Sequence, residues 1–370
     1  MSQVAKSGPL PAKAGRDRYI DFLRTGSLLI VVIWHWLFNV VSWRADGPHF
    51  GNPIATTTGF WALTWLFQVL PVFFFVGGFS HLVSWESVQH KGGGYLQFVG
   101  KRLRRLMPPL AICLAAAGVA WLVISMLFPE VPWIGRAIYL MLSPLWFLGI
   151  YLAMMLLTPL TVRLHRKGGE IVPVVMVGLV VAVDVARFRY HLRGIEVVNL
   201  LLVWALAHQL GFFWKRLIEA PRRLAWCLTL GGFMGLAALT NIGLYPRSMV
   251  GVPGEAISNM GPPTLCIVAL TFFQVGVVLL ARGRLSQWLE DAGPQKFMGW
   301  AGARAMTIYL WHFPGFAIAY ALVSLLGLNV PERPDSAWWI QRPLWAVLPA
   351  LCTIPLVAFF RRFEQGRTGR

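Results

Sequence analysis

The amino-acid sequence predicts an all-α, polytopic integral membrane protein with about ten transmembrane helices and both termini in the cytoplasm. Its 370 residues are 57% hydrophobic and 13% charged, with a mean hydropathy of +0.61. A soluble domain has about a quarter of its residues charged. Apolar runs long enough to cross a hydrocarbon core of about 30 Å recur along the chain. Basic residues concentrate in alternate loops, which is typical of membrane proteins.

Each predicted helix is an apolar run of about 17 to 25 residues between polar or turn-forming segments. The polar N-terminal segment is not followed by a cleavage-site pattern, so we expect an uncleaved first helix rather than a signal peptide. The predicted helices cover residues 19–43, 57–83, 106–128, 138–162, 170–187, 195–214, 224–243, 262–282, 305–327 and 341–360.

The loop charges test this count. With a cytoplasmic N-terminus, about 24 of the 33 Lys and Arg residues fall on the cytoplasmic side and about eight on the opposite side. Adding or removing one helix would scramble this distribution. No connection is long enough for an independent soluble core. We therefore predict a single transmembrane domain over 19–360, between a cytoplasmic tail, 1–18, and a basic cytoplasmic tail, 361–370.

Composition also bears on partners and cofactors. In a soluble protein a net charge of +18 would suggest nucleic acid, but here the loop charges that set topology account for it, so the bilayer is the expected partner and nucleic acid is not. The four cysteines lie in apolar runs without paired spacing, and the eight histidines show no His-x-x-x-His pattern. We therefore expect no disulfide framework, no metal site and no bound cofactor.

The first predicted helix carries three ionisable side chains around which the rest of the chain is interpreted. Asp21 and Arg24 are three residues apart and can touch on one helix face. His35 follows Arg24 by eleven residues, about three turns, and returns to that face roughly 16 Å deeper. An ionisable group at such a depth is costly, which makes His35 a candidate functional residue.

A basic cluster precedes the third predicted helix on the same predicted side as Arg24. It reads Lys101-Arg102-Leu-Arg-Arg105. Arginine forks and helix N-termini both suit phosphate oxygens, so one interpretation is a phosphate clamp. The other is anchoring at anionic lipid head groups.

Several further motifs have both a structural and a functional interpretation. The glycine pair at Gly77 and Gly78 allows close approach of another backbone or of a ligand. Trp146 can belong to an aromatic belt. His208 and His312 can be hydrogen-bonded core residues, or they can line a substrate site. Pro314, two residues after His312, is expected to kink its helix.

Together these motifs resemble the membrane acyltransferase-3 family, the acyl-CoA-dependent integral membrane O-acyltransferases, in its actinobacterial-type form. The likeness lies in Tyr19-Ile-Asp21 followed by Arg24, ten intervening residues and His35; in the Phe-rich, Gly-containing stretch 73–80; in Arg-x-x-Arg at Arg102 and Arg105; in the Trp146 motif; in Asn259-Met-Gly-Pro-Pro; and in Tyr-Leu-x-His-x-Pro from Tyr309. The resemblance implies that Arg24 and His35 are the residues most closely tied to acyl transfer.

The function that the resemblance implies is transfer of an acyl group, expected to be acetyl, from cytoplasmic acyl-CoA to a hydroxyl of a cell-envelope sugar, glycolipid or similar acceptor. His35 is the expected general base. No Gly-x-Ser-x-Gly motif is present, so we favour direct transfer, with a transient acyl-His step left open. Asp21 and Arg24 complete the expected catalytic set. The expected acyl-CoA-binding residues are Arg24, Lys101, Arg102 and Arg105, and the expected acceptor path contains Trp146, Asn259, Tyr309 and His312.

Two other classes stay open. A multi-pass transporter or flippase of a lipid-linked substrate also suits intramembrane histidines, although the two halves of the chain show no inverted repeat. A haem or quinone protein could use His35, His208 and His312. Consumption of acetyl-CoA with release of free thiol discriminates the enzyme from the transporter. The Gly-, Arg-, Ala- and Val-rich composition suggests a high-GC bacterium and hence its inner or plasma membrane.

Overall fold

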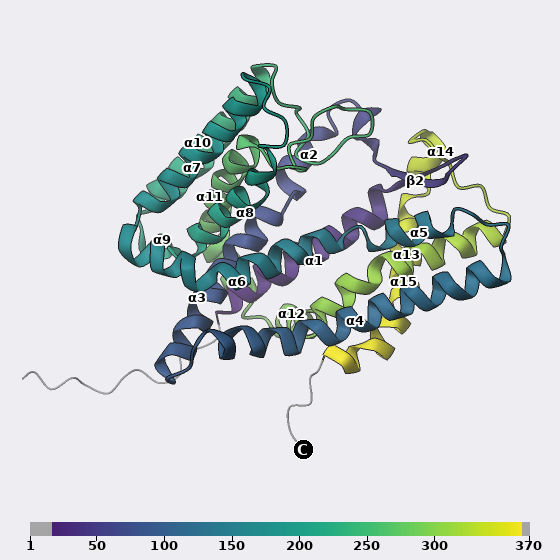
Figure 1. Cartoon of the computed structure of the whole chain (residues 1–370), viewed down its shortest axis with the longest axis horizontal. Helices are drawn as coiled ribbons and strands as arrows, with labels where there is room; N and C mark the ends of the chain where they lie inside the picture. The colour runs from purple at the N-terminus through teal and green to yellow at the C-terminus, as the bar shows by residue number, and fades with distance from the viewer. Residues whose placement is uncertain (1–16, 365–370) are drawn as a thin grey trace, which may run out of the picture.

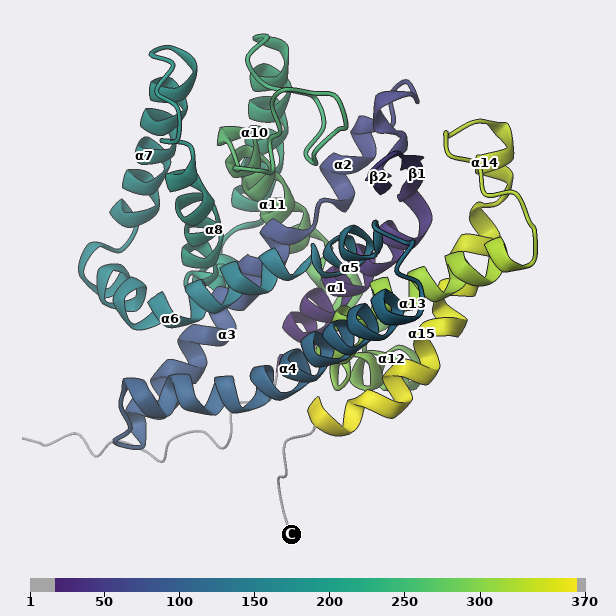
Figure 2. The ribbon, with the colours of Figure 1, turned by 45° about the vertical axis from the view of Figure 1, so that its right-hand side comes forward.

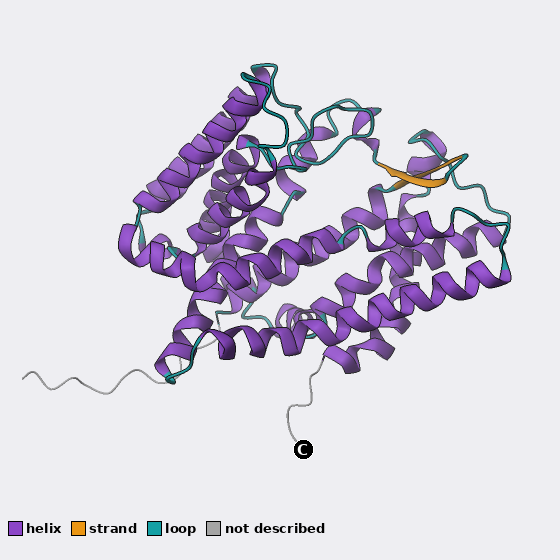
Figure 3. Ribbon diagram, in the orientation of Figure 1, coloured by secondary structure: helices purple, strands orange, loops and turns teal. Residues whose placement is uncertain are grey.

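The structure is a computed structural model in which residues 17–364 are described; the predicted tails, apart from 17–18 and 361–364, lie outside the described residues. Helices dominate, and the strands form one antiparallel hairpin (Figures 1 and 3). The elements are α1 (Arg18–Phe38), β1 (Val40–Arg44), β2 (Gly47–Gly51), the 3₁₀ helix η1 (Pro53–Ala55), α2 (Trp61–Phe67), α3 (Leu70–His90), α4 (Tyr95–Leu127), α5 (Ile134–Leu142), α6 (Leu145–Gly168), α7 (Ile171–Phe188), α8 (Val197–Gly211), α9 (Trp214–Glu219), α10 (Arg222–Asn241), α11 (Leu265–Trp288), α12 (Ala292–Gly302), α13 (Ala305–Leu325), α14 (Ser336–Ile340) and α15 (Arg342–Glu364).

The predicted all-α, polytopic membrane class is confirmed. Within residues 17–364, nine segments are long and apolar enough to cross a membrane, with α2–α3 and α5–α6 each counted as one. The 15-residue helix α8 is a shorter apolar helix in addition to these nine. Figure 2 shows α7, α8, α10 and α11 on one side of the molecule and α13 and α15 on the other, with α1 and α3 between them.

Hydrogen bonds and ion pairs show which helix ends lie together on one face, which we call the basic face. Trp214 at the start of α9 donates to Asp17 beside α1 at 3.1 Å. Arg216 of α9 pairs with Glu170 before α7 at 2.6 Å. Glu364 at the end of α15 accepts from backbone nitrogens at the start of α13. Both ends of the described chain therefore lie on the basic face, as an even number of crossings requires.

The opposite face, called here the hairpin face, is built on β1 and β2. Trp43 of β1 donates through its backbone nitrogen to Glu332 at 3.1 Å, and Asn52 donates to the carbonyl of Gly251 at 2.7 Å. The loop 242–264 and the segment between α13 and α14 thereby pack beside the hairpin. Figure 1 shows β2 and α14 together at this face, far from the end of α15.

Helix α8 runs between the two faces although it is the shortest of the apolar helices. Fifteen residues extend about 22 Å, less than a typical hydrocarbon core. Val203, Trp204, Leu206 and Ala207 are fully buried, since α8 packs among α3, α6, α7 and α11. Protein rather than lipid surrounds the middle of α8, so its length need not match the bilayer. With α8 counted, residues 17–364 contain ten candidate crossings.

Several predicted helix boundaries were wrong, and local chemistry explains them. The first helix ends at Phe38 instead of residue 43, because the β-branched Val40 and Val41 enter a strand that turns back at Gly47, whose φ is +109°. The third helix starts eleven residues early, at Tyr95, and continues through Pro108 and Pro109. Breaks at Gln68 and at Ser143 divide two of the other predicted helices.

Glycines set the distance between α3 and α8. A Cβ added at Gly78 would meet the backbone carbonyl of His208, and one added at Gly211 would meet the carbonyl of Phe75. Backbone cannot move aside as a flexible side chain can. Of the two interpretations of the glycine pair, Gly78 therefore fits close helix packing.

We predict that Gly211→Ala destabilises the protein and that Gly178→Ala does not. The added methyl group of Gly211→Ala overpacks the α3–α8 contact, at a cost of about 1–3 kcal/mol. Gly178 in α7 has open space around its Cβ position, so alanine is tolerated there and favours the helix. Thermal unfolding of the two detergent-purified variants measures the difference. Equal melting temperatures would show that α3 and α8 are not packed this closely.

Candidate functional site

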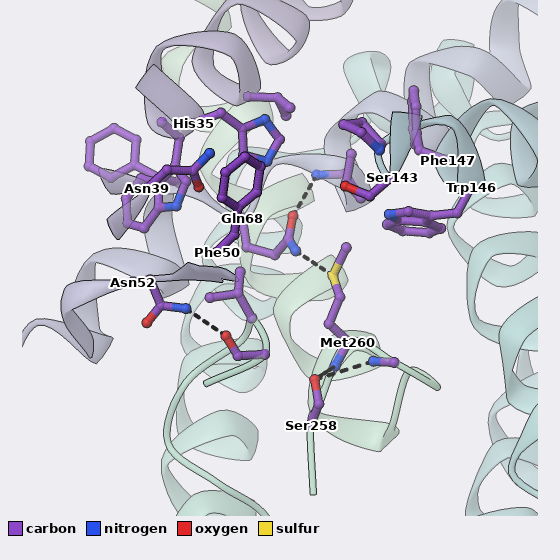
Figure 4. Close-up of a pocket in the computed structure, with 18 of the residues that line it drawn as sticks. His35, Asn39, Phe50, Asn52, Gln68, Ser143, Trp146, Phe147, Ser258 and Met260 are labelled. Atoms are coloured by element: carbon purple, nitrogen blue, oxygen red, sulfur yellow. Dashed lines mark hydrogen bonds between the residues drawn. The ribbon is translucent and has the colours of Figure 1, made fainter. Parts of the chain in front are cut away.

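A cavity of about 1010 Å³ lies between α1, α3, α6 and α13 and reaches the hairpin face. Helix α1 contributes one face to it, from Ser27 through His35 to Asn39. Facing walls come from Phe50 of β2 and from Trp146 of α6. Figure 4 shows His35, Asn39 and Phe50 on one side of the cavity, Ser143 and Trp146 on the other, and Ser258 and Met260 below. His35, predicted from the sequence as the central residue, therefore borders a space that a substrate can fill.

His35 is held by a second imidazole from α13. Its Nδ1 lies 3.2 Å from Nε2 of His312, which is 1% exposed. Nδ1 of His312 lies 2.5 Å from the carbonyl oxygen of Tyr309, three residues earlier in the same helix. A carbonyl oxygen only accepts, so Nδ1 of His312 carries the proton and Nε2 of a neutral His312 is an acceptor. His35 then donates through Nδ1, which leaves the lone pair on its Nε2.

Other contacts fix the helix that carries His312. The indole of Trp36 donates to the carbonyl of His312 at 3.0 Å. The hydroxyl of Tyr309 donates to the carbonyl of Pro144, which ties α13 to the start of α6. At the helix start, the buried carboxylate of Glu364 accepts from the backbone nitrogens of Met306 and Thr307. The imidazole pair is therefore held by contacts along the first half of α13.

The cavity approaches the basic face near Arg24. Its innermost residue on α1 is Ser27, which lies one turn, about 4.5 Å along the axis, from Arg24. Arg24 pairs with Asp21 at 2.8 Å, as their spacing predicted, and both side chains are partly exposed. The ion pair lies outside the cavity lining and does not contact His35. A group bound at Arg24 could reach the cavity, whereas Arg24 itself does not orient the imidazole.

The three basic residues of the predicted clamp differ in their surroundings. Arg102 is half-buried, with its guanidinium 4.3 Å from the centre of the Phe98 ring. Lys101 and Arg105 are exposed near the start of α4. The charges of Arg24 and Arg102 both act on the His81 imidazole of α3. The structure thus brings Arg24 and Arg102 to one region of the basic face, with Lys101 and Arg105 beside it.

The four residues of the predicted acceptor path fall in three different places. Trp146 and Tyr309 line the cavity. His312 lies behind His35 as its hydrogen-bond partner. Asn259 is completely buried in the loop before α11, where its amide donates to the carbonyls of Pro246 and Ser248. Asn259 is not part of the cavity lining, and its contacts make it a loop clamp.

The hairpin wall of the cavity is fastened from outside by α5. Arg136 contacts Asp46 at 2.6 Å and Nδ1 of His49 at 2.8 Å, and His49 contacts Asp46 at 2.8 Å. The hydrogen bond from His49, together with the charge of Arg136, lowers the pKa of the Asp46 carboxyl. These contacts hold Phe50 at the cavity.

Sequence reasoning missed several residues of the site. Phe50 of β2 and Asn52, which follows the hairpin directly, both line the cavity. The hydropathy pattern had assigned the hairpin partly to the first helix and partly to a loop. His81 was not singled out at all, yet it meets His208 and Tyr151 in the interior. The signal for His81 was present, since it is an ionisable residue in a long apolar run. Among residues 17–364, no group of three or more His, Cys, Asp and Glu could hold a metal ion.

A family model described as an acyltransferase domain, the acyltransferase-3 domain, matches residues 17–362. This match covers nearly the whole chain, and the chain therefore belongs to the acyltransferase-3 family. It is a multi-pass membrane protein of the acyltransferase class. Neither curated proteins nor solved structures give a significant match to it.

We predict that His312→Ala lowers the rate of acyl transfer by about tenfold or more, because His35 loses the hydrogen bond that orients it. His312→Gln should keep most of the activity, since its side-chain oxygen can accept from Nδ1 of His35. The measurement is the turnover of both purified variants over a range of pH. Full activity in folded His312→Ala would show that the second imidazole does not position the first.

Proposed function

We propose that this acyltransferase moves an acyl group, acetyl in the first instance, from cytoplasmic acyl-CoA to a hydroxyl of a cell-envelope sugar, glycolipid or similar membrane-borne acceptor. The observation that carries the proposal is the position of His35. It borders a cavity that reaches the hairpin face, its Nε2 is left unprotonated by the contact with His312, and the cavity ends one helical turn from Arg24.

The cavity walls support a sugar-bearing acceptor. Aromatic rings such as Trp34 and Trp146 give flat apolar surfaces against which a sugar ring or a lipid chain can pack. Polar side chains stand between them, including Asn52, Gln68 and Ser143. The amide nitrogen of Asn39, one turn from His35, is buried without a hydrogen-bond partner in residues 17–364. A hydroxyl-rich ligand would satisfy this donor.

The basic face supports an anionic acyl donor. Arg24 and Arg102 lie in one region, with Lys101 and Arg105 exposed beside them. Coenzyme A carries several phosphates, which arginine forks bind well. The positive-inside rule puts this face in the cytoplasm, where acyl-CoA is available, which fits a bacterial inner or plasma membrane. Head-group anchoring remains the competing role for the exposed pair.

The reaction requires no covalent enzyme intermediate. The acceptor O–H bond breaks as His35 Nε2 takes the proton, and the oxygen forms a bond to the thioester carbonyl carbon. The C–S bond then breaks, the electron pair leaves on sulfur, and the imidazolium returns the proton to give free CoA. His312 accepts the Nδ1–H of His35 throughout. The charge that develops on His35 is therefore shared with a buried neighbour rather than with water.

We predict that His35→Ala abolishes transfer, by at least about 100-fold, because a positioned general base contributes roughly that factor. The protein is reconstituted with a lipid and glycolipid extract of cells lacking the gene, and radiolabelled acetyl-CoA is supplied. Label enters the extract and thiol is released with the unaltered protein and with His90→Ala, an exposed histidine of the basic face.

Two outcomes of this experiment would contradict the proposal. Absence of label and thiol with the unaltered protein rejects acyl-CoA-dependent transfer and leaves the carrier interpretation. Full activity in folded His35→Ala removes only the base assignment. Mass spectrometry of the labelled product identifies the acceptor.

We also predict that Arg102→Glu with Arg105→Glu weakens CoA binding by about tenfold or more, since charge-assisted hydrogen bonds contribute about 1.5–3 kcal/mol each. The loss should depend on salt, because part of the attraction acts through water. Calorimetry at two ionic strengths measures it. Arg163→Glu, an exposed arginine of α6 near the same face, is the matched control. Unchanged CoA affinity in the double variant would leave these residues only a role in topology.

A further inference from the structure

A second pair of imidazoles lies in the interior, on helices that do not carry His35. Nδ1 of His81 in α3 lies 3.0 Å from Nε2 of His208 in α8, and both residues are 1% exposed. Nε2 of His81 lies 3.1 Å from the hydroxyl of Tyr151 in α6. Nδ1 of His208 is buried and has no hydrogen-bond partner among the described residues. The three side chains form one chain of contacts that ends at a tyrosine.

The unpartnered nitrogen decides the direction of the hydrogen bonds. If Tyr151 donated to His81 and His81 to His208, the Nδ1–H of His208 would be a buried donor without an acceptor. In the reverse direction His208 donates to His81 and His81 to the oxygen of Tyr151, and only a lone pair is left unpaired. An orphaned buried N–H is the rarer and more costly defect. The reverse direction is therefore favoured, and it leaves the Tyr151 O–H free to donate.

The free hydroxyl lies between the cavity and the basic face. The Tyr151 ring packs against Phe73, a cavity-lining residue, with ring centres 5.7 Å apart. His81, which holds the hydroxyl, follows Phe73 by eight residues, about 12 Å farther toward the basic face. Arg102 lies within electrostatic range of both Tyr151 and His81. A molecule extending from the arginines to the cavity would pass this hydroxyl.

We propose that Tyr151, held by His81 and His208, is a binding site for the thioester arm of the acyl donor. This inference rests on the proposed function, since it assigns the arm of the donor to a place in the same protein. The phosphates of the donor bind at Arg24 and Arg102, and the pantetheine arm runs inward. A carbonyl of this arm accepts the Tyr151 hydrogen bond on the way from the basic face to the cavity.

The hydroxyl makes no covalent bond and transfers no proton. Because His81 donates to the phenol oxygen, it polarises the O–H and makes it a better donor. Tyr151 would thus contact the substrate, while His81 and His208 position it.

The test compares two donors that differ only at the phosphate end. Acetyl-CoA and acetyl-pantetheine share the thioester arm, but acetyl-pantetheine lacks the phosphates and the nucleotide. Binding of each to the full-length purified protein is measured by calorimetry, so the acceptor need not be known. Tyr151→Phe should weaken both donors by about tenfold, the factor that one hydrogen bond contributes. Arg102→Gln should weaken acetyl-CoA and leave acetyl-pantetheine unchanged.

Matched variants separate this role from a structural one. Tyr190→Phe removes an exposed hydroxyl after α7 and should bind both donors like the unaltered protein. His208→Gln keeps an N–H donor toward His81 and should restore near-normal affinity, whereas His208→Leu should lose affinity as Tyr151→Phe does. If Tyr151→Phe does not fold, the His208→Gln and His208→Leu pair still tests the proposal.

The outcomes distinguish this inference from the proposed function. If the unaltered protein binds neither donor and transfers no label, the proposed function fails. If it binds and transfers while Tyr151→Phe binds both donors with unchanged affinity, only the Tyr151 site is rejected. A Tyr151→Phe variant that weakens acetyl-CoA but not acetyl-pantetheine would also reject it, because the effect would then belong to the phosphate end.

Discussion

The cost of an unpaired polar group inside a membrane governs this structure. An imidazole in hydrocarbon must find a hydrogen-bond partner from the protein, and here four imidazoles form two pairs. The contact between His35 and His312 ties α1 to α13, and the contact between His81 and His208 ties α3 to α8. Each pair joins helices that are distant in the sequence. The candidate site residues are therefore also polar contacts that specify how these helices pack.

The same rule applies at the helix ends. The buried carboxylate of Asp184 accepts from Asn199, from Tyr245 and from the first backbone nitrogen of α11. Glu364 caps α13 in the same way on the basic face. A carboxylate that satisfies otherwise free helix N–H groups fixes where a helix begins. These contacts fix the starts of α11 and α13 at positions remote from the cavity.

Family membership and the cavity explain different things. The match over residues 17–362 gives the class of reaction, whereas the position of His35 beside a cavity is the basis of the site proposed for it. The transporter interpretation explains the intramembrane histidines but gives no role to the lone pair that the hydrogen bonds leave on Nε2 of His35. The proposed donor path on the basic face and acceptor path on the hairpin face meet at His35.

The sequence by itself determined the membrane class, and it singled out Arg24 and His35 as candidate site residues, because hydropathy, loop charge and spacing along one helix are local properties. It could also show that Asp21 meets Arg24. Only the tertiary structure decided that His312 supports His35, that Asn259 is a loop clamp, and that a β-hairpin closes one wall of the cavity. Such pairings depend on which helix faces approach each other. Apolar helices of similar composition carry no local signal for that choice, and close packing at residues such as Gly78 makes it.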